Sequence, residues 1–209
     1  MKMKNIAALT LSTVLTAGCT STAFLKSTYD NPGQPGYITT SLSKFDNKSM
    51  LSMTPAYLYD IRPNLRLGLR WNSLLDEDKI IMIAEWGAAK NFDPKSTLDF
   101  NIDGEFVHLT PIDSNQYGIV STRTVMSSGP FSVPVELGNQ TRKTYWASKK
   151  ILEKIINAKK VVVRAQLLDS YSEAQLEPDA ESLSVYKNYP FIWAKGGFKK
   201  FLKAIPANK

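Results

Sequence analysis

The amino-acid sequence predicts a mainly β (α+β) fold: an antiparallel β-sandwich or curled sheet with one or two short helices late in the chain. Three observations support this prediction. Segments with strand character, either alternating or rich in β-branched residues, follow one another from residue 37 to residue 126. Short polar turns separate pairs of these segments. Apolar residues with helical spacing are found only after residue 148, so strands and helices do not alternate along the chain.

The predicted strands account for most of the chain before residue 130. They cover residues 37–45, 50–61, 65–71, 80–86, 97–102, 105–109 and 117–126, and two more are expected at 161–168 and 181–186. Pro55 indicates that the second segment is an edge strand, because proline cannot donate a hydrogen bond to a neighbouring strand. Asp76-Glu77-Asp78 predicts one hairpin turn, and Asp103-Gly104 predicts a second, tighter one.

Two short helices are expected near the end of the chain. Ser148 is placed to cap the first, which ends near Ala158 and has an apolar stripe formed by Ile151, Leu152, Ile155 and Ile156. Gly196-Gly197 precedes the second helix, which ends at Pro206 and has an apolar face formed by Phe198, Phe201, Leu202 and Ile205. Because no repeat or linker is found after the first strand, we expect residues 37–209 to form one globular domain.

The composition excludes several classes of protein. The 209 residues carry a formal net charge of +7, and 43% of them are hydrophobic, which is too many for a disordered chain. The single cysteine excludes an internal disulfide framework and a multi-thiolate metal site. The single histidine, His108, leaves too few imidazoles for catalytic zinc. We therefore expect neither a metal nor a cofactor.

The N-terminal 18 residues have the layout of a secretory signal peptide. Lys2 and Lys4 provide a basic start, and a short apolar stretch then leads to the small residues Ala17 and Gly18. A bilayer span takes about 20 apolar residues, so this stretch is too short to be a transmembrane helix. We expect residues 1–18 to be removed during export.

The segment Leu15-Thr16-Ala17-Gly18-Cys19 resembles the processing site of bacterial lipoprotein precursors. In that class a dedicated peptidase cuts before the cysteine, whose thiol carries a diacylglycerol and whose new amino group is often acylated as well. The resemblance implies that Cys19 is lipidated and anchors the chain to a membrane, although the class prefers an aliphatic residue where this chain has Thr16. The alternative is an ordinary secretion signal followed by an incidental cysteine.

The residues after Cys19 suggest a location and a tether. Residue 20 is Thr, and under the sorting rule of Gram-negative lipoproteins a residue other than aspartate implies the outer membrane, here with the protein facing the periplasm. Residues 19–36 are rich in Thr, Ser, Gly and Pro, which predicts a flexible tether beginning at the lipidated Cys19. Fully extended, this tether would reach roughly 50 Å.

A polar cleft is one expectation for the hairpin around the first acidic turn. Glu85 follows an apolar run and precedes Trp86, while Arg70 lies beside Trp71 on the partner strand. With the turn centred between positions 76 and 77, Arg70 is diagonal to Glu85 and within reach of an ion pair. One interpretation is a structural ion pair at the sheet surface. The other is a polar cleft in which Trp71 and Trp86 form the walls.

Basic residues gather in the last third of the chain. Lys149, Lys150 and Lys154 lie on the first predicted helix, and residues 195–209 add further lysines with no acid. Such a basic face is suited to an anionic membrane surface or an acidic envelope protein. The alternative is a solvated helix face without a partner. Nucleic acid is not expected, because the sequence contains no recognition motif for it.

No catalytic constellation is recognisable in the sequence. His108 fits one face of a strand, and the carboxylate pairs Asp99 with Asp103 and Glu177 with Asp179 are imaginable glycosidase acids whose separation the sequence does not define. The late aromatic residues either pack one end of the sandwich or form a stacking surface for carbohydrate or peptide; they are Tyr186, Tyr189, Phe191 and Trp193.

The sequence therefore favours a non-enzymatic function, that of a lipid-anchored binding or structural protein of the bacterial envelope. One alternative is an envelope hydrolase that acts on glycan or peptide through carboxylates. Another is an assembly partner of an envelope complex, recognised through the basic helix.

Overall fold

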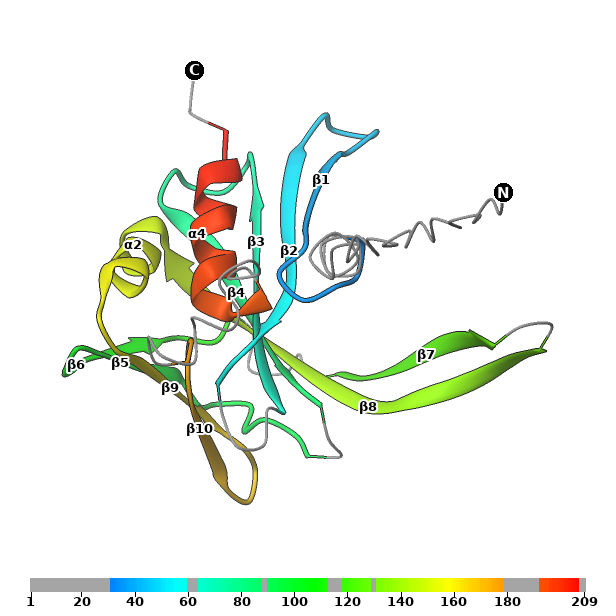
Figure 1. Ribbon diagram of the computed structural model, residues 1–209. Coiled ribbons are helices and arrows are strands. Elements are labelled where there is room, and N and C mark those ends of the chain that lie inside the picture. The colour runs from blue at the N-terminus through cyan, green and yellow to red at the C-terminus, as the bar shows by residue number, and fades with distance from the viewer. Residues whose placement is uncertain are drawn as a thin grey trace, which may run out of the picture.

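Two antiparallel sheets and two short helices make up the described fold (Figure 1). The computed structural model describes residues 31–59, 64–87, 90–112, 118–128, 131–178 and 192–206, and for 118–128 and 131–139 it describes the backbone alone. The predicted signal peptide, Cys19, the first part of the tether, the strand expected at 181–186 and all of the late aromatic residues except Trp193 lie outside these ranges.

The larger sheet has six strands in the order β1-β2-β3-β4-β8-β7. These strands are β1 (Ile38–Leu42), β2 (Ser49–Tyr57), β3 (Leu65–Asn72), β4 (Lys79–Trp86), β7 (Gly118–Ser128) and β8 (Phe131–Ser148). The smaller sheet has the order β10-β9-β5-β6 and consists of β5 (Leu98–Ile102), β6 (Glu105–Leu109), β9 (Val161–Gln166) and β10 (Tyr171–Gln175). The mainly β prediction is confirmed.

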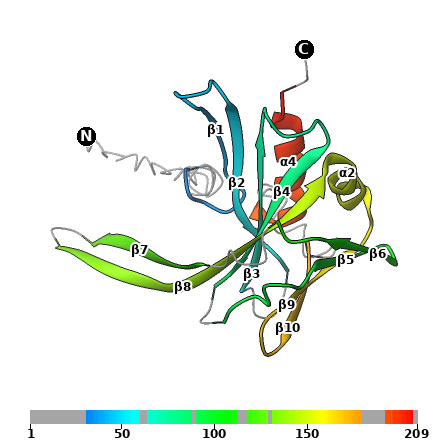
Figure 2. The ribbon, with the colours of Figure 1, turned by 180° about the vertical axis from the view of Figure 1, so that it is seen from behind.

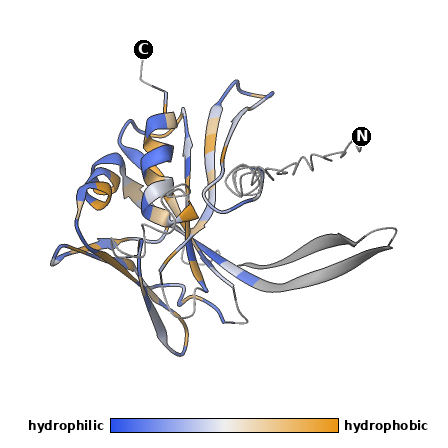
Figure 3. Ribbon diagram, in the orientation of Figure 1, coloured by the Kyte–Doolittle hydropathy of each residue, from blue (hydrophilic) through white to orange (hydrophobic). Residues whose placement is uncertain are grey.

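Helices α2 (Lys149–Asn157) and α4 (Ala194–Ala204) pack against each other, and α4 also contacts β2 and β3. Each helix has a hydrophobic side and a hydrophilic side (Figure 3). Ser148 caps α2 as predicted, because its hydroxyl accepts a hydrogen bond from the Ile151 N–H at 3.1 Å. The Gly196-Gly197 pair lies inside α4 and not before it, since the Gly197 N–H already donates to Trp193 O. No helix within the described ranges is both long enough and apolar enough to cross a membrane.

One hydrophobic core joins both sheets and both helices. Its fully buried members include Leu67 of β3, Met82 of β4, Phe100 of β5, Val163 of β9 and Phe201 of α4. Because side chains alternate along each strand, the same strands present their other residues on the outer side of each sheet. The outer side of the smaller sheet carries the site described below.

The second strand, β2, is not an edge strand, because β1 lies outside it. A β-bulge between Met53 and Ala56 removes Pro55 from the regular ladder, which explains how an interior strand accommodates proline. The bulge also brings the β2 backbone close to Gly68 of β3. A Cβ atom at position 68 would lie 2.8 Å from Met53 O, so only glycine fits without a shift of the strands.

The sequence predicts neither β8 nor β10. Pro134 and Gly138 interrupt the pattern of β8, and the basic residues near its end suggest a solvated segment. The outer parts of β7 and β8 form a two-stranded hairpin that extends away from the rest of the fold in both views (Figures 1 and 2).

The last residues of the predicted tether lie against the larger sheet. The Gly36 N–H donates to Thr54 O, which places this part of the chain beside β2.

Candidate functional site

The hairpin of β3 and β4 does not contain the predicted cleft. Arg66, not Arg70, lies opposite Glu85, because the turn is centred one residue earlier than expected and the register shifts by two. Arg70 is exposed on the outer side of the sheet. Trp71 and Trp86 are buried on the inner side, since neighbouring residues of a strand point to opposite faces. The predictions of an Arg70–Glu85 pair and of tryptophan walls are therefore wrong.

Glu85 forms a structural ion-pair row instead. Its side chain is only 4% exposed and lies between two arginines, with Arg142 Nε at 2.7 Å and Arg66 Nη1 at 3.8 Å. The three residues stand opposite one another on β3, β4 and β8, and the Arg66 guanidinium lies over the Tyr57 ring at 4.9 Å. This row links adjacent strands across the sheet, and we assign it a structural role.

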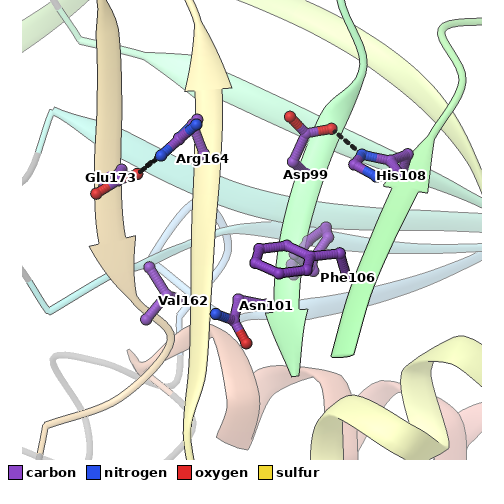
Figure 4. A pocket seen from close by; sticks show the side chains of 8 residues that line it. Asp99, Asn101, Phe106, His108, Val162, Arg164 and Glu173 are labelled. Carbon is purple, nitrogen blue, oxygen red and sulfur yellow. Dashed lines mark hydrogen bonds and ion pairs between the residues drawn. The ribbon is translucent and has the colours of Figure 1, made fainter. Parts of the chain in front are cut away.

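A hollow of about 380 Å³ lies on the outer face of the smaller sheet (Figure 4). All four strands contribute to it, and the lining residues are Asp99, Phe100, Asn101, Phe106, His108, Val162, Arg164 and Glu173. Except for Phe100, which is a buried core residue at the base of the hollow, these side chains point outward, and the alternate side chains of the same strands belong to the core. A site built on strands is positioned more rigidly than one built on loops.

Four of the lining side chains stand in one row across the sheet. Glu173 lies opposite Arg164, Arg164 opposite Asp99, and Asp99 opposite His108. Acidic and basic residues therefore alternate from β10 to β6. We call these four residues the charged row.

The charged row consists of two hydrogen-bonded pairs (Figure 4). Arg164 Nε donates to Glu173 Oε1 at 2.6 Å, and this bond raises the pKa of Arg164 above its ordinary value. On the other side, Asp99 Oδ1 lies 2.7 Å from His108 Nδ1 and also accepts the Thr97 hydroxyl at 2.6 Å. All four side chains of the row remain at least 32% exposed, so a ligand can reach them.

A second row, parallel to the first, is less polar. Val162 lies opposite Asn101, and Asn101 lies opposite Phe106. The Phe106 side chain is 67% exposed, so its ring is accessible to a ligand in the hollow. We call these three residues the apolar row, since an aliphatic and an aromatic side chain flank one amide. The hollow thus has a charged side and an apolar side.

The turn that joins β5 and β6 is the predicted tight hairpin. Asp103 and Gly104 both have positive φ, 51° and 97°, as such a turn requires. The Asp103 carboxylate accepts the N–H groups of Lys159 and Lys160 at 2.9 and 2.7 Å, and these two bonds lower its pKa. Asp103 thus ties the hairpin to the segment after α2. Asp103 does not line the hollow with Asp99, so the two carboxylates do not form the pair considered for a glycosidase.

A buried lysine supports the hollow from the core side. The side chain of Lys143 on β8 is almost fully buried, and its ammonium donates to Asp93 O and to Ser96 O at 2.5 and 2.8 Å. Burial lowers the pKa of Lys143 to about 8. Because Ser96 directly precedes Thr97, which hydrogen-bonds Asp99, Lys143 fixes the segment that leads into the charged row.

The predicted basic face is only partly free. Lys154 forms an ion pair with Glu105 of β6, and Lys149 is half-buried, while Lys150 is exposed. On the neighbouring helix α4, Lys199 and Lys203 are exposed. The binding of this face to an anionic surface or to an acidic protein remains a prediction.

Among the residues that the structure describes, the remaining candidates from the sequence do not form a second site. Glu177 pairs with Lys195, and its proposed partner Asp179 lies outside the described ranges. No group of three or more His, Cys, Asp or Glu side chains is placed to hold a metal ion in the described part of the chain. The sequence had singled out Asp99 and His108 of the hollow, but it gave no sign that Arg164 and Glu173, from two other strands, join them.

Comparison with known proteins gives no relative: no family model, no curated protein and no solved structure matches this chain. The function therefore has to be inferred from the residues themselves.

Proposed function

We propose that this chain is a lipid-anchored binding protein of the bacterial envelope, without enzymatic activity, and that its ligand lies on the outer face of the smaller sheet. The hollow carries this proposal. It combines paired charges, an amide and an exposed aromatic ring on rigid strands, as ligand sites do.

The arrangement of the carboxylates favours binding over hydrolysis. Asp99 and Glu173 line the same hollow, but a strand that carries Arg164 lies between theirs. Each carboxylate contacts a basic side chain, His108 or Arg164. A glycosidase needs one carboxyl group that keeps its proton, and an apolar environment is what maintains that state. Carboxylates that are held by basic side chains on an exposed sheet face are instead suited to accept hydrogen bonds from a ligand.

The envelope location is supported by the segment Leu15-Thr16-Ala17-Gly18-Cys19. One acyl chain binds a membrane only marginally, whereas the two or three chains of a processed lipoprotein hold it stably. Thr20 supports sorting to the outer membrane, from which the domain would face the periplasm.

Metabolic labelling tests the anchor. The wild-type chain should incorporate labelled palmitate and fractionate with membranes, and Cys19→Ser should incorporate none. Ser21→Ala is a matched control, because it changes a neighbouring hydroxyl residue and leaves the cysteine in place. An unlabelled wild-type chain, or equal labelling of Cys19→Ser, would refute the lipoprotein assignment.

A second contact is favoured by the exposed lysines of α2 and α4. Lys150, Lys199 and Lys203 lie on helices that pack against each other, so they can meet one anionic membrane surface or one acidic envelope protein, including a partner in an assembly. Charge reversal to Glu at these three positions should weaken association with anionic vesicles, measured in the Cys19→Ser background. Unchanged association would leave the lysines as a solvated surface.

A further inference from the structure

We propose that the ligand of the hollow is an uncharged glycan. This inference rests on the binding function proposed above and adds the chemical class of the ligand. It follows from the pairing of the polar groups in the charged row, from their hydrogen-bonding capacity and from the apolar row.

The polar groups of the charged row already have partners. Arg164 forms an ion pair with Glu173, and Asp99 is hydrogen-bonded to His108 and to the Thr97 hydroxyl, so a charged ligand meets neither a guanidinium nor a carboxylate without a partner. A charged ligand would have to break one of these pairs, at the cost of leaving its partner alone. A neutral ligand can bind without separating either pair.

The hydrogen-bonding groups match a polyol. The carboxylates of Asp99 and Glu173 only accept, the guanidinium of Arg164 only donates, and the amide of Asn101 does both. A hydroxyl group donates and accepts, so adjacent hydroxyls of one sugar ring can satisfy a carboxylate and a guanidinium that stand side by side. An aliphatic or aromatic ligand would displace water from the remaining donor and acceptor positions of these groups without replacing its hydrogen bonds.

The apolar row supplies the other half of a sugar-binding surface. A sugar ring has C–H faces as well as hydroxyl edges. Phe106 offers an exposed ring and Val162 a half-buried aliphatic side chain, on either side of Asn101 (Figure 4). Beyond the hollow, the Tyr171 ring is 60% exposed and lies against the Arg164 guanidinium at 5.0 Å. A ring placed over Phe106 and Val162 would direct its hydroxyls toward the charged row.

The volume limits the size of the bound unit. About 380 Å³ lies near the lower end of the range of roughly 300–1,000 Å³ for small-molecule sites. The hollow is therefore suited to one or two sugar residues, with the rest of a longer chain outside it.

An array of immobilised neutral oligosaccharides tests the inference. The full-length chain, purified in detergent with its anchor, is applied to the array, and soluble forms of the bound sugars are then titrated. Arg164→Ala should weaken binding at least about tenfold, and Phe106→Ala about three- to tenfold. The matched controls are Arg70→Ala and Phe45→Ala, which remove exposed side chains of the same two types outside the hollow. Because the ligand is uncharged, the affinity should change less than about twofold between 0.05 and 0.5 M NaCl.

Two further ligand classes are tested in parallel: acidic oligosaccharides and a displayed peptide library. They distinguish a failure of the glycan assignment from a failure of the proposed binding function. Absence of binding to every neutral sugar, or binding that Arg164→Ala and Phe106→Ala leave unchanged, would overturn the glycan assignment. If peptides or acidic sugars bind instead and the same variants abolish that binding, the hollow is a binding site but not for neutral glycan. If the two variants affect no ligand of any class, the proposed binding function of the outer face fails as well.

Discussion

Replacement of Glu85 by Gln tests how the larger sheet is held together. The carboxylate is buried between Arg142 and Arg66, at 2.7 and 3.8 Å, and the amide that replaces it keeps the size but loses the charge. Both guanidinium groups would then share a poorly hydrated site without an anion. We expect the variant to fold and to be less stable than the wild type.

The size of the loss follows from the exposure of the three groups. Breaking a fully buried ion pair costs about 3–5 kcal/mol, and an exposed pair contributes about 0–1 kcal/mol. The carboxylate is 4% exposed, whereas the arginine side chains are 32% and 38% exposed, so solvent partly compensates them. We therefore expect Glu85→Gln to lower the free energy of unfolding by about 2 kcal/mol and the melting temperature by about 4–8 °C.

Urea denaturation followed by tryptophan fluorescence measures this change. Glu105→Gln is the control for an exposed pair, because Glu105 and its partner Lys154 are 61% and 43% exposed, and its cost should stay below about 1 kcal/mol. Arg142→Ala should be clearly destabilising, and Arg70→Ala should change stability by less than about 0.5 kcal/mol. Equal losses for Arg70→Ala and Arg142→Ala, or a smaller loss for Glu85→Gln than for Glu105→Gln, would refute this account of the row.

Three further predictions concern single positions. Gly68→Ala places a Cβ atom 2.8 Å from Met53 O and should lower the free energy of unfolding, measured by urea denaturation, by about 1–3 kcal/mol. Gly87→Ala, where the nearest atom would lie 3.6 Å from the new Cβ, should cost much less. Similar losses of stability in the two variants would contradict the close approach at Gly68. The pKa of Lys143 is lowered to about 8, so the folded state gives up this proton at a lower pH than the unfolded state, and the contribution of Lys143 to stability should rise from pH 8 toward pH 10. Lys143→Met should abolish that rise, measured as the urea midpoint at each pH. An identical pH dependence of the midpoint in both proteins would show that Lys143 does not cause the rise. The pKa of Asp103 is lowered by the N–H groups of Lys159 and Lys160, so Asp103→Ala should lower the melting temperature at pH 7. The difference in melting temperature from wild type should shrink as the pH falls below about 4. A difference that stays constant with pH would argue against an ionised acceptor at this position.

Local signals were sufficient to predict much of the fold. Asp103-Gly104 predicted its hairpin because few residue pairs accept positive φ at both positions of a two-residue turn. Ser148 predicted the start of α2 because the cap and the apolar stripe lie within one short segment. The acidic turn after Trp71 was also found, but its centre was misplaced by one residue. A one-residue error in a hairpin centre changes every cross-strand pair, and so Glu85 was assigned to Arg70 and not to Arg66.

The parts that the sequence did not predict depend on contacts between distant segments. Lys143 belongs to a run of basic residues, and only the packing of β8 against the segment of Asp93 and Ser96 shows that it is buried. The charged row needs the order β10-β9-β5-β6, which brings Glu173 and His108 into one line although they are far apart in the sequence. The sequence pattern of a single strand does not show which strands lie next to it in the sheet.

Photocrosslinking in intact cells tests the central claim most directly, because it does not depend on the class of ligand. A photoreactive phenylalanine derivative at position 106 projects from the hollow, and the same group at position 74 projects from the turn between β3 and β4, where Leu74 is equally exposed. The account predicts a defined adduct from position 106 that disappears in the Arg164→Ala background and is absent from position 74. No adduct at position 106, or the same adducts from both positions, would contradict the assignment of the outer face as the binding surface.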